Sequence, residues 1–158
     1  RIDWCQMPLS LIWTRSYRSL AYLCGKEHIR TATYSPLGSG LLSGRYREKG
    51  DLPSQDHRRD LFPFTETSVE AWRHLCATLE AESREADTDM ASLALAWVLA
   101  HPVDTVLTGA RTRAQVERSA KAAGLTVRPS AMEALDHAAR QLDASIDDSE
   151  DNPFFHRW

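Results

Sequence analysis

Two glycine-containing segments that lead into arginines are the parts of this sequence best suited to binding chemistry. Residues 38–44 (GSGLLSG) precede Arg45, and Gly109 precedes Arg111. Glycine lets a backbone amide approach a phosphate closely, and arginine binds phosphate through a planar fork of N–H donors. Two such loops at the carboxyl-terminal edge of a parallel sheet could hold one anionic ligand between them. The residues therefore indicate an anion-binding site.

Simpler interpretations remain open for both segments. Residues 38–44 could form an ordinary turn, and Arg47, Arg58 and Arg113 are expected to be mainly solvated surface side chains. The spacing G-x-G-x-x-x-G is one residue longer than the Rossmann fingerprint, and no Gly-Lys-Ser/Thr follows it as in a P-loop. A helix beginning near Gly40 would add its positive end to the site.

Metal and nucleophile patterns are absent from the sequence. The six histidines and three cysteines show no metal-ligand spacing, so we expect no metal. A Gly-x-Ser-x-Gly elbow is also missing. Because the cysteines are odd in number and widely spaced, we expect free thiols in a reducing cytoplasm rather than a disulfide framework.

Length and composition narrow the class of protein further. The chain has 158 residues, an apolar share of 42% and a net charge of −3. These values favour a globular protein and argue against nucleic-acid binding, which needs a basic surface. The most apolar stretch, residues 91–100, is about half of the ~20 residues that cross a membrane. The chain opens on Arg1, which we interpret as a processed chain or a part of a longer one.

Alternating strand and helix patterns predict an α/β fold with a parallel sheet. Three strands and five or six amphipathic helices are expected. A sheet of three parallel strands cannot close on itself and leaves two exposed edges. We expect strands at residues 2–6, 29–34 and 105–108, and helices at residues 15–26, 67–85, 90–100, 111–123 and 130–142.

Two segments fall outside these elements. Residues 44–64 form a long polar connection with Gly50, Pro53 and Pro63, and loops of this length are usually functional or disordered. Residues 143–158 form an acidic and then aromatic tail, whose end could fold over a pocket or fray.

The two strand-end loops together resemble a known family. Residues 34–46 read YSPLGSGLLSGRY, very like the YSPLGxGLLTGKY segment of aldo-keto reductases. Residues 93–99 (LALAWVL) resemble the ALAW helix of that family, and residues 109–115 (GARTRAQ) resemble its GARxxxQ cofactor loop. Residues 3–15, with Gln6, are similar to the IDxxQxxYSLxxR strand and loop of the family, with Leu9 in place of the usual aromatic residue of that loop. The motifs follow family order over nearly the whole chain.

The resemblance implies that this chain binds NADP(H) as its cofactor. Tyr34 would stack on the nicotinamide and Gln6 would hold its carboxamide, while the first loop would line the pyrophosphate. Arg111 and Gln115 would approach the adenosine 2′-phosphate and the adenine. The residues at the family's cofactor positions are Gln6, Tyr34, Ser35, Pro36, Leu37, Gly38, Ser39, Arg45, Gly109, Arg111, Gln115, Arg118 and Ser119.

Two positions in this set depart from the family pattern. Arg118 and Ser119 stand where the family usually has Glu and Asn near the adenine. A further arginine would favour a phosphate, since its charge is permanently positive.

The resemblance also implies that the chain is the C-terminal portion of a (β/α)8 barrel, over residues 1–158. Its three strands match the sixth, seventh and eighth of the family, whereas the catalytic Asp, Tyr, Lys and His lie on the first four. We therefore assign no catalytic residue and predict that the chain alone does not reduce a carbonyl or oxidise an alcohol. A carbonyl substrate would be used only if an N-terminal half completed the barrel.

Two alternatives remain. The chain could be a non-catalytic module, derived from the same family, that binds a nucleotide or serves as an auxiliary partner of another chain. It could also be a fragment without function whose exposed sheet edges lead to self-association.

Overall fold

Three parallel strands form the sheet on which the rest of the chain is arranged. They are β1 (Trp4–Pro8), β2 (Arg30–Tyr34) and β3 (Thr105–Leu107), in the order β1-β2-β3. The register pairs Gln6 with Ala32 and Tyr34 with Leu107. The computed structural model describes residues 1–146, and every statement about the structure refers to these residues. The predicted α/β fold with a three-stranded parallel sheet is confirmed.

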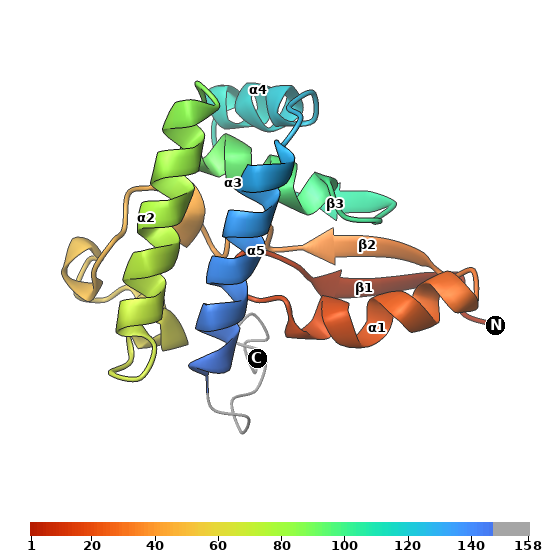
Figure 1. Ribbon diagram of the computed structural model, residues 1–158, viewed down its shortest axis with the longest axis horizontal. Coiled ribbons are helices and arrows are strands. Elements are labelled where there is room, and N and C mark those ends of the chain that lie inside the picture. Colours follow the sequence, from red (N-terminus) through yellow and green to blue (C-terminus); the bar gives the residue numbers. More distant parts are fainter. Residues whose placement is uncertain (147–158) are drawn as a thin grey trace.

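The described residues form five α-helices, in agreement with the lower of the two predicted numbers. In Figure 1, α1 runs beside β1, α2 and α5 lie side by side, and α4 crosses near the start of α3. The strands and α1 extend away from the α2–α5 pair, which gives the molecule two arms. The helices are α1 (Arg15–Lys26), α2 (Val69–Glu85), α3 (Met90–Leu99), α4 (Arg113–Ala122) and α5 (Pro129–Ala144).

Helix α3 is the central element of the helical layer. Every residue from Met90 to Val98 is buried, as expected for a helix that is apolar all round. The Asp89 side chain accepts a 2.9 Å hydrogen bond from the Ser92 amide, so the helix begins at a capped position. None of the described helices is long and apolar enough to cross a membrane.

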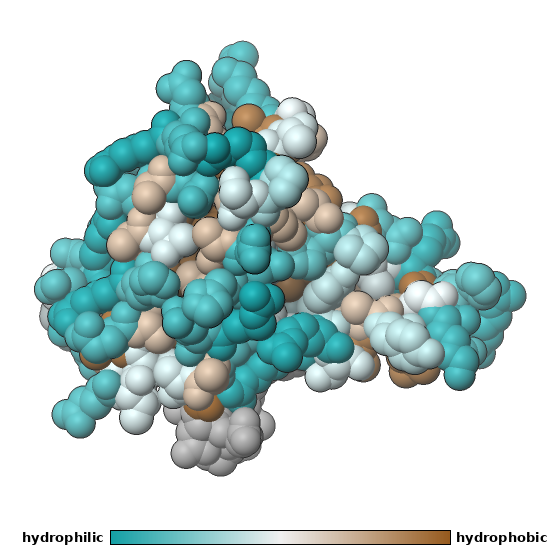
Figure 2. Space-filling model, viewed as in Figure 1, coloured by the Kyte–Doolittle hydropathy of each residue, from teal (hydrophilic) through white to brown (hydrophobic). Residues whose placement is uncertain are grey.

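The surface is more polar than this interior. Hydrophilic side chains cover most of the face seen in Figure 2, and hydrophobic groups appear there in scattered patches. The sheet has one covered face, which includes the buried Met7 and Thr33, and one open face. Trp4 and Gln6 belong to the open face, because they alternate with the covered residues along β1 and are exposed.

Several element boundaries differ from the sequence expectation, and three of the differences bear on the site or on the tail. Strand β1 continues through Pro8 because the next amide, that of Leu9, donates to the Tyr34 carbonyl at 3.2 Å. The ring nitrogen of Pro8 therefore faces the open edge, where no donor is needed. Near Gly40 there is only a 3₁₀ turn, Leu41–Ser43, so no helix adds its positive end there. Helix α5 extends to Ala144, into the segment expected as a tail.

The long connection at residues 44–64 is held by packing and has no α-helix or strand. It contains three 3₁₀ turns, Lys49–Asp51, His57–Asp60 and Phe62–Phe64. The indole Nε1 of Trp72 donates to the Arg47 carbonyl at 2.8 Å. The Phe64 ring lies edge-on to Trp72, with 6.0 Å between the ring centroids. The connection is thereby fixed against α2. Apart from its first residues, the predicted aromatic tail lies outside the described residues.

Candidate functional site

A cavity of about 500 Å³ lies where the loops after β2 and β3 meet. The parallel register brings the carboxyl-terminal ends of these two strands side by side, so the loops that follow them share one edge of the sheet. Helix α3 forms the floor through Ala91, Ser92 and Leu95. The sequence-predicted residues that line the cavity are Ser35, Pro36, Leu37, Ser39, Arg45, Gly109, Arg111, Gln115, Arg118 and Ser119.

Three of the predicted residues do not line the cavity. Gln6 and Tyr34 lie on the open face of the sheet, and Tyr34 is the register partner of Leu107, which does line the cavity. Tyr34 therefore lies beside the cavity rather than in its wall, whereas Gln6 is one strand further away, on β1. Gly38 belongs to the loop after β2 but is buried, and it packs against Ile12 instead of facing the cavity.

The packing of Gly38 leaves no room for a side chain. Its φ angle is +52°, in the left-handed region that glycine adopts most readily. A Cβ placed on it would lie 2.3 Å from Cδ1 and 2.7 Å from Cγ1 of Ile12. Ile12 is fully buried in the loop after β1. Gly38 thus lets the loop after β2 rest directly on the loop after β1.

The backbone of this loop is mostly bonded to itself. The amides of Gly38 and Gly40 donate to the carbonyls of Ser35 and Leu37, each at 2.9 Å. The amides of residues 41–43 also donate to carbonyls within residues 37–40. Among the described residues, the amides of Leu37 and Ser39 have no partner. The amides of Gly38 and Gly40, which were expected to approach a phosphate, are therefore already bonded within the loop.

Arginine side chains supply the charge of the cavity. The charged residues that line it are Arg45, Arg58, Arg111 and Arg118, with no carboxylate among the lining residues. In the described part of the chain, the guanidinium groups of Arg45 and Arg111 have no ion-pair partner. Since guanidinium groups remain protonated at all ordinary pH values, the cavity suits a ligand with several negative charges.

Arg58 is the one charged lining residue that was not among the predicted site residues. Its Nη1 donates to the Ser39 carbonyl at 3.0 Å, and its Nη2 lies 2.6 Å from the Asp56 carboxylate. Its guanidinium also lies 4.4 Å from the centroid of the Tyr46 ring. The hydrogen bonds from Arg58 hold the pKa of Asp56 well below its usual range, and they raise the pKa of Arg58 itself. Arg58 therefore ties the 44–64 connection to the first loop.

No motif in the sequence distinguished Arg58 from its neighbours. It was expected to be mainly solvated, as were Arg47 and Arg113. Arg47 instead forms a 2.8 Å ion pair with Glu80 on α2. Arg113 fits the expectation, because it is highly exposed and pairs along the surface of α4 with Glu117 at 2.6 Å.

The Gln115 side chain caps the amino-terminal end of α4. Its Oε1 accepts from the amides of Arg111 and Thr112, at 2.7 and 3.2 Å. The Thr112 side chain accepts in return from the Gln115 amide, which completes a capping box. Only the side-chain NH₂ of Gln115 remains available to a ligand. The described residues contain no cluster that could hold a metal ion, and their three cysteines are free thiols.

Comparison with known proteins identifies the family. The sequence model of the aldo/keto reductase family matches residues 1–140, and the chain belongs to that family. The resemblance carried by the loop motifs is thereby confirmed.

Individual relatives agree with this assignment. An uncharacterized oxidoreductase of Mycobacterium tuberculosis is 31% identical over 136 residues, which is 85% of this chain and 41% of that protein. An NADP(+) aldo-keto reductase of Schizosaccharomyces pombe is 29% identical over 97 residues, 61% of this chain and 28% of that protein.

A solved structure supports the fold. A glycerol dehydrogenase of Gluconobacter oxydans superposes with a TM-score of 0.76 at 23% identity, covering 94% of this chain and 46% of that one. The fold thus corresponds to part of an aldo-keto reductase barrel. The chain spans less than half the length of each of these three proteins.

Proposed function

We propose that this chain forms the cofactor-binding portion of an NADP(H)-dependent oxidoreductase that interconverts carbonyl compounds and alcohols. The observation that carries the proposal is the cavity at the ends of β2 and β3, whose charged lining residues are all arginines. A dinucleotide with a pyrophosphate and a 2′-phosphate carries negative charge on both of these groups, which the arginines can bind. The NADP(+) designation of the S. pombe relative supports the same cofactor.

The cavity suggests a division of the cofactor between its two walls. Arg111, at the end of β3, would bind the 2′-phosphate through a bidentate contact, with Arg118 on α4 next to it. Arg45 and Arg58 would bind the pyrophosphate with the unpaired amides of the first loop. Tyr34, on the open face of the sheet, would support the nicotinamide.

Gln6 would hold the carboxamide of that nicotinamide from the same face. NADPH, when bound, supplies a hydride for carbonyl reduction. A proton donor is required as well, and the residues at the family's matched positions include no catalytic Asp, Tyr, Lys or His. In this proposal the chain is the C-terminal portion of a barrel and does not turn over alone. The proton donor and the carbonyl substrate would come into place with an N-terminal half.

A nucleotide titration tests the proposal. Tryptophan fluorescence should show saturable quenching by NADPH, and the Arg111→Ala variant should bind NADPH about 10- to 100-fold more weakly, since a hydrogen bond to a charged group contributes ~1.5–3 kcal/mol. NADH binding should change less than about threefold, because NADH lacks the 2′-phosphate. Arg113→Ala is the matched control, since Arg113 lies two residues away but does not line the cavity. Equal losses for NADPH and NADH would remove Arg111 from this role.

An assay with an aromatic aldehyde tests the absence of turnover. We expect no NADPH oxidation above the buffer blank from this chain alone. Measurable oxidation by a preparation free of other reductases would overturn this part of the proposal.

The second candidate function is a non-catalytic module that binds a nucleotide or another chain. The sheet favours it, because β1 and β3 each have a single neighbour and so present an unpaired edge. These edges could also lead to self-association. Analytical ultracentrifugation distinguishes the cases: a monomer over the whole concentration range would exclude self-association.

We further propose a cytoplasmic location and no nucleic-acid partner, supported by the free thiols and the net charge of −3.

A further inference from the structure

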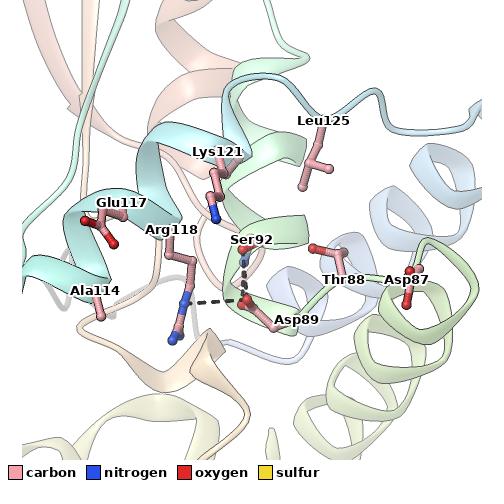
Figure 3. Close-up of a pocket in the computed structure, with 10 residues that line it drawn as sticks. Asp87, Thr88, Asp89, Ser92, Ala114, Glu117, Arg118, Lys121 and Leu125 are labelled. Carbon is pink, nitrogen blue, oxygen red and sulfur yellow. Dashed lines mark hydrogen bonds and ion pairs between the residues drawn. The ribbon is translucent and has the colours of Figure 1, made fainter.

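A second cavity, of about 700 Å³, lies between the start of α3 and the length of α4. We call it the α3–α4 cleft. Figure 3 shows Arg118 and Lys121 reaching from α4 toward Asp89 and Ser92 at the start of α3. Its volume is in the range of small-molecule sites. The proposed cofactor occupies the other cavity, so this cleft has no assigned ligand.

Two of the three carboxylates that line the cleft, those of Asp89 and Glu117, already have partners. Asp89 accepts from the amide and the hydroxyl of Ser92, at 2.9 and 3.0 Å, and lies 3.6 Å from Nε of Arg118. Glu117 is bonded to Arg113 at 2.6 Å. Asp87 lies at the other end of the cleft from Glu117 in Figure 3. Asp89 and Glu117 thus have little remaining capacity to bind a cation.

The cationic groups of the cleft are less committed. Among the described residues, the side-chain ammonium group of Lys121 has no ion pair or hydrogen bond. Arg118 uses one nitrogen in its contact with Asp89, and its side chain is 48% exposed, so several N–H donors remain available. Ala114 and Leu125 provide exposed apolar surface in the same cleft. The cleft therefore places the unpaired ammonium group of Lys121 and the remaining N–H donors of Arg118 in the same cavity as a small apolar surface.

We propose that the α3–α4 cleft is a second binding site, for a small organic anion with a carboxylate or phosphate on a short apolar chain. Lys121 and Arg118 bind the anionic group, and the apolar chain lies against Leu125, whose side chain is partly exposed. The Thr88 hydroxyl, which also lines the cleft, can donate a further hydrogen bond.

The two cavities are adjacent, and they share residues. Ser92 and Arg118 line both of them. An anion in the cleft draws the Arg118 guanidinium toward Lys121, whereas a nucleotide phosphate draws it toward Arg111. The two ligands therefore weaken each other, and the effect is reciprocal. This consequence rests on the proposed function, but the binding of an anion in the cleft does not.

Backbone NMR of the full chain tests the binding site, with sodium butyrate and butyl phosphate as probes. The amides of Thr88, Asp89 and residues 114–122 should shift saturably, with Kd in the millimolar range. Equal concentrations of sodium chloride and of neutral butanamide should not reproduce these shifts. Whichever probe binds more tightly identifies the preferred anionic group.

The Lys121→Met variant should bind the better probe at least threefold more weakly. Lys26→Met, on the exposed end of α1, should bind it as the wild type does. If neither probe gives saturable shifts at up to 50 mM, or if Lys121→Met binds both unchanged, the site does not exist as proposed.

The coupling is measured separately. Saturating butyrate should raise the Kd for NADPH at least threefold in the wild type and leave it unchanged in Arg118→Gln. An unchanged wild-type Kd would overturn the shared role of Arg118. If NADPH does not bind at all, the proposed function fails, while the NMR titration still decides whether the cleft binds an anion.

Discussion

Replacing Gly38 with alanine should destabilise the protein more than the same change at Gly40. Both glycines have left-handed backbone, with φ of +52° at Gly38 and +86° at Gly40. An alanine in this region costs about 1–2 kcal/mol, partly offset by ~0.4–1 kcal/mol from the reduced freedom of the unfolded chain. The two positions share these contributions.

The surroundings of the two glycines differ. A Cβ at Gly38 would lie 2.3 Å from Cδ1 of Ile12, whereas at Gly40 its nearest neighbour is Nη1 of Arg58 at 3.6 Å. Overpacking of a buried site costs about 1–3 kcal/mol. We therefore expect a loss of about 2–4 kcal/mol for Gly38→Ala and about 1 kcal/mol for Gly40→Ala.

Urea denaturation followed by tryptophan fluorescence measures both losses, with equal slopes as the check that the unfolding reaction is the same. Repeating Gly38→Ala in an Ile12→Ala background tests the cause. Without Cδ1 and Cγ1 the nearest atom of residue 12 is Cβ, at 4.0 Å, so the excess cost should disappear. Losses at Gly38 and Gly40 that agree within 0.5 kcal/mol, or an excess that survives in the Ile12→Ala background, would refute the steric argument.

Three further outcomes are expected. Burial raises the pKa of the Asp143 carboxyl above its ordinary 3.8, so the folded state binds the proton more tightly than the unfolded state. Above pH 3.8 the wild type should lose stability relative to Asp143→Asn as the pH rises, measured by urea denaturation at several pH values. Burial also raises the pKa of the Cys76 thiol to about 12, so iodoacetamide at pH 8 should label the half-buried Cys5 first and Cys76 only after unfolding, as read by mass spectrometry. Trp72→Phe should lower stability by about 1–3 kcal/mol, because it removes the 2.8 Å hydrogen bond to the Arg47 carbonyl.

Each of these outcomes has a clear opposite. A constant difference between wild type and Asp143→Asn across pH would show that the carboxyl does not titrate differently in the two states. Rapid alkylation of native Cys76 would contradict its burial. A Trp72→Phe variant as stable as the wild type would mean that the 44–64 connection is not held through this hydrogen bond.

The predicted site was recovered in part from the sequence, and the reasons for success and failure differ by residue. Arg45 and Arg111 belong to recognisable loop motifs that follow β2 and β3, so local sequence and the parallel arrangement were enough to place them at one cavity. Arg58 lies within a connection without periodicity, and its contact with Ser39 spans 19 residues. No local pattern encodes such a contact. Gln115 was identified by its motif, but only the structure shows that its Oε1 accepts hydrogen bonds from the amides of Arg111 and Thr112 and so caps α4.

The sequence by itself determined the class of fold, the family and the two loops that would meet. Hydrophobic periodicity and loop motifs are local properties of the chain, and parallel strands bring their ends to one edge of a sheet. Only the tertiary structure decided which groups face the cavity. It showed that the glycine loop bonds mainly to itself, that Arg58 closes the connection over it, and that Arg118 stands between two cavities. These features depend on contacts between residues far apart in the chain, and such contacts form only once the helices and strands have packed together.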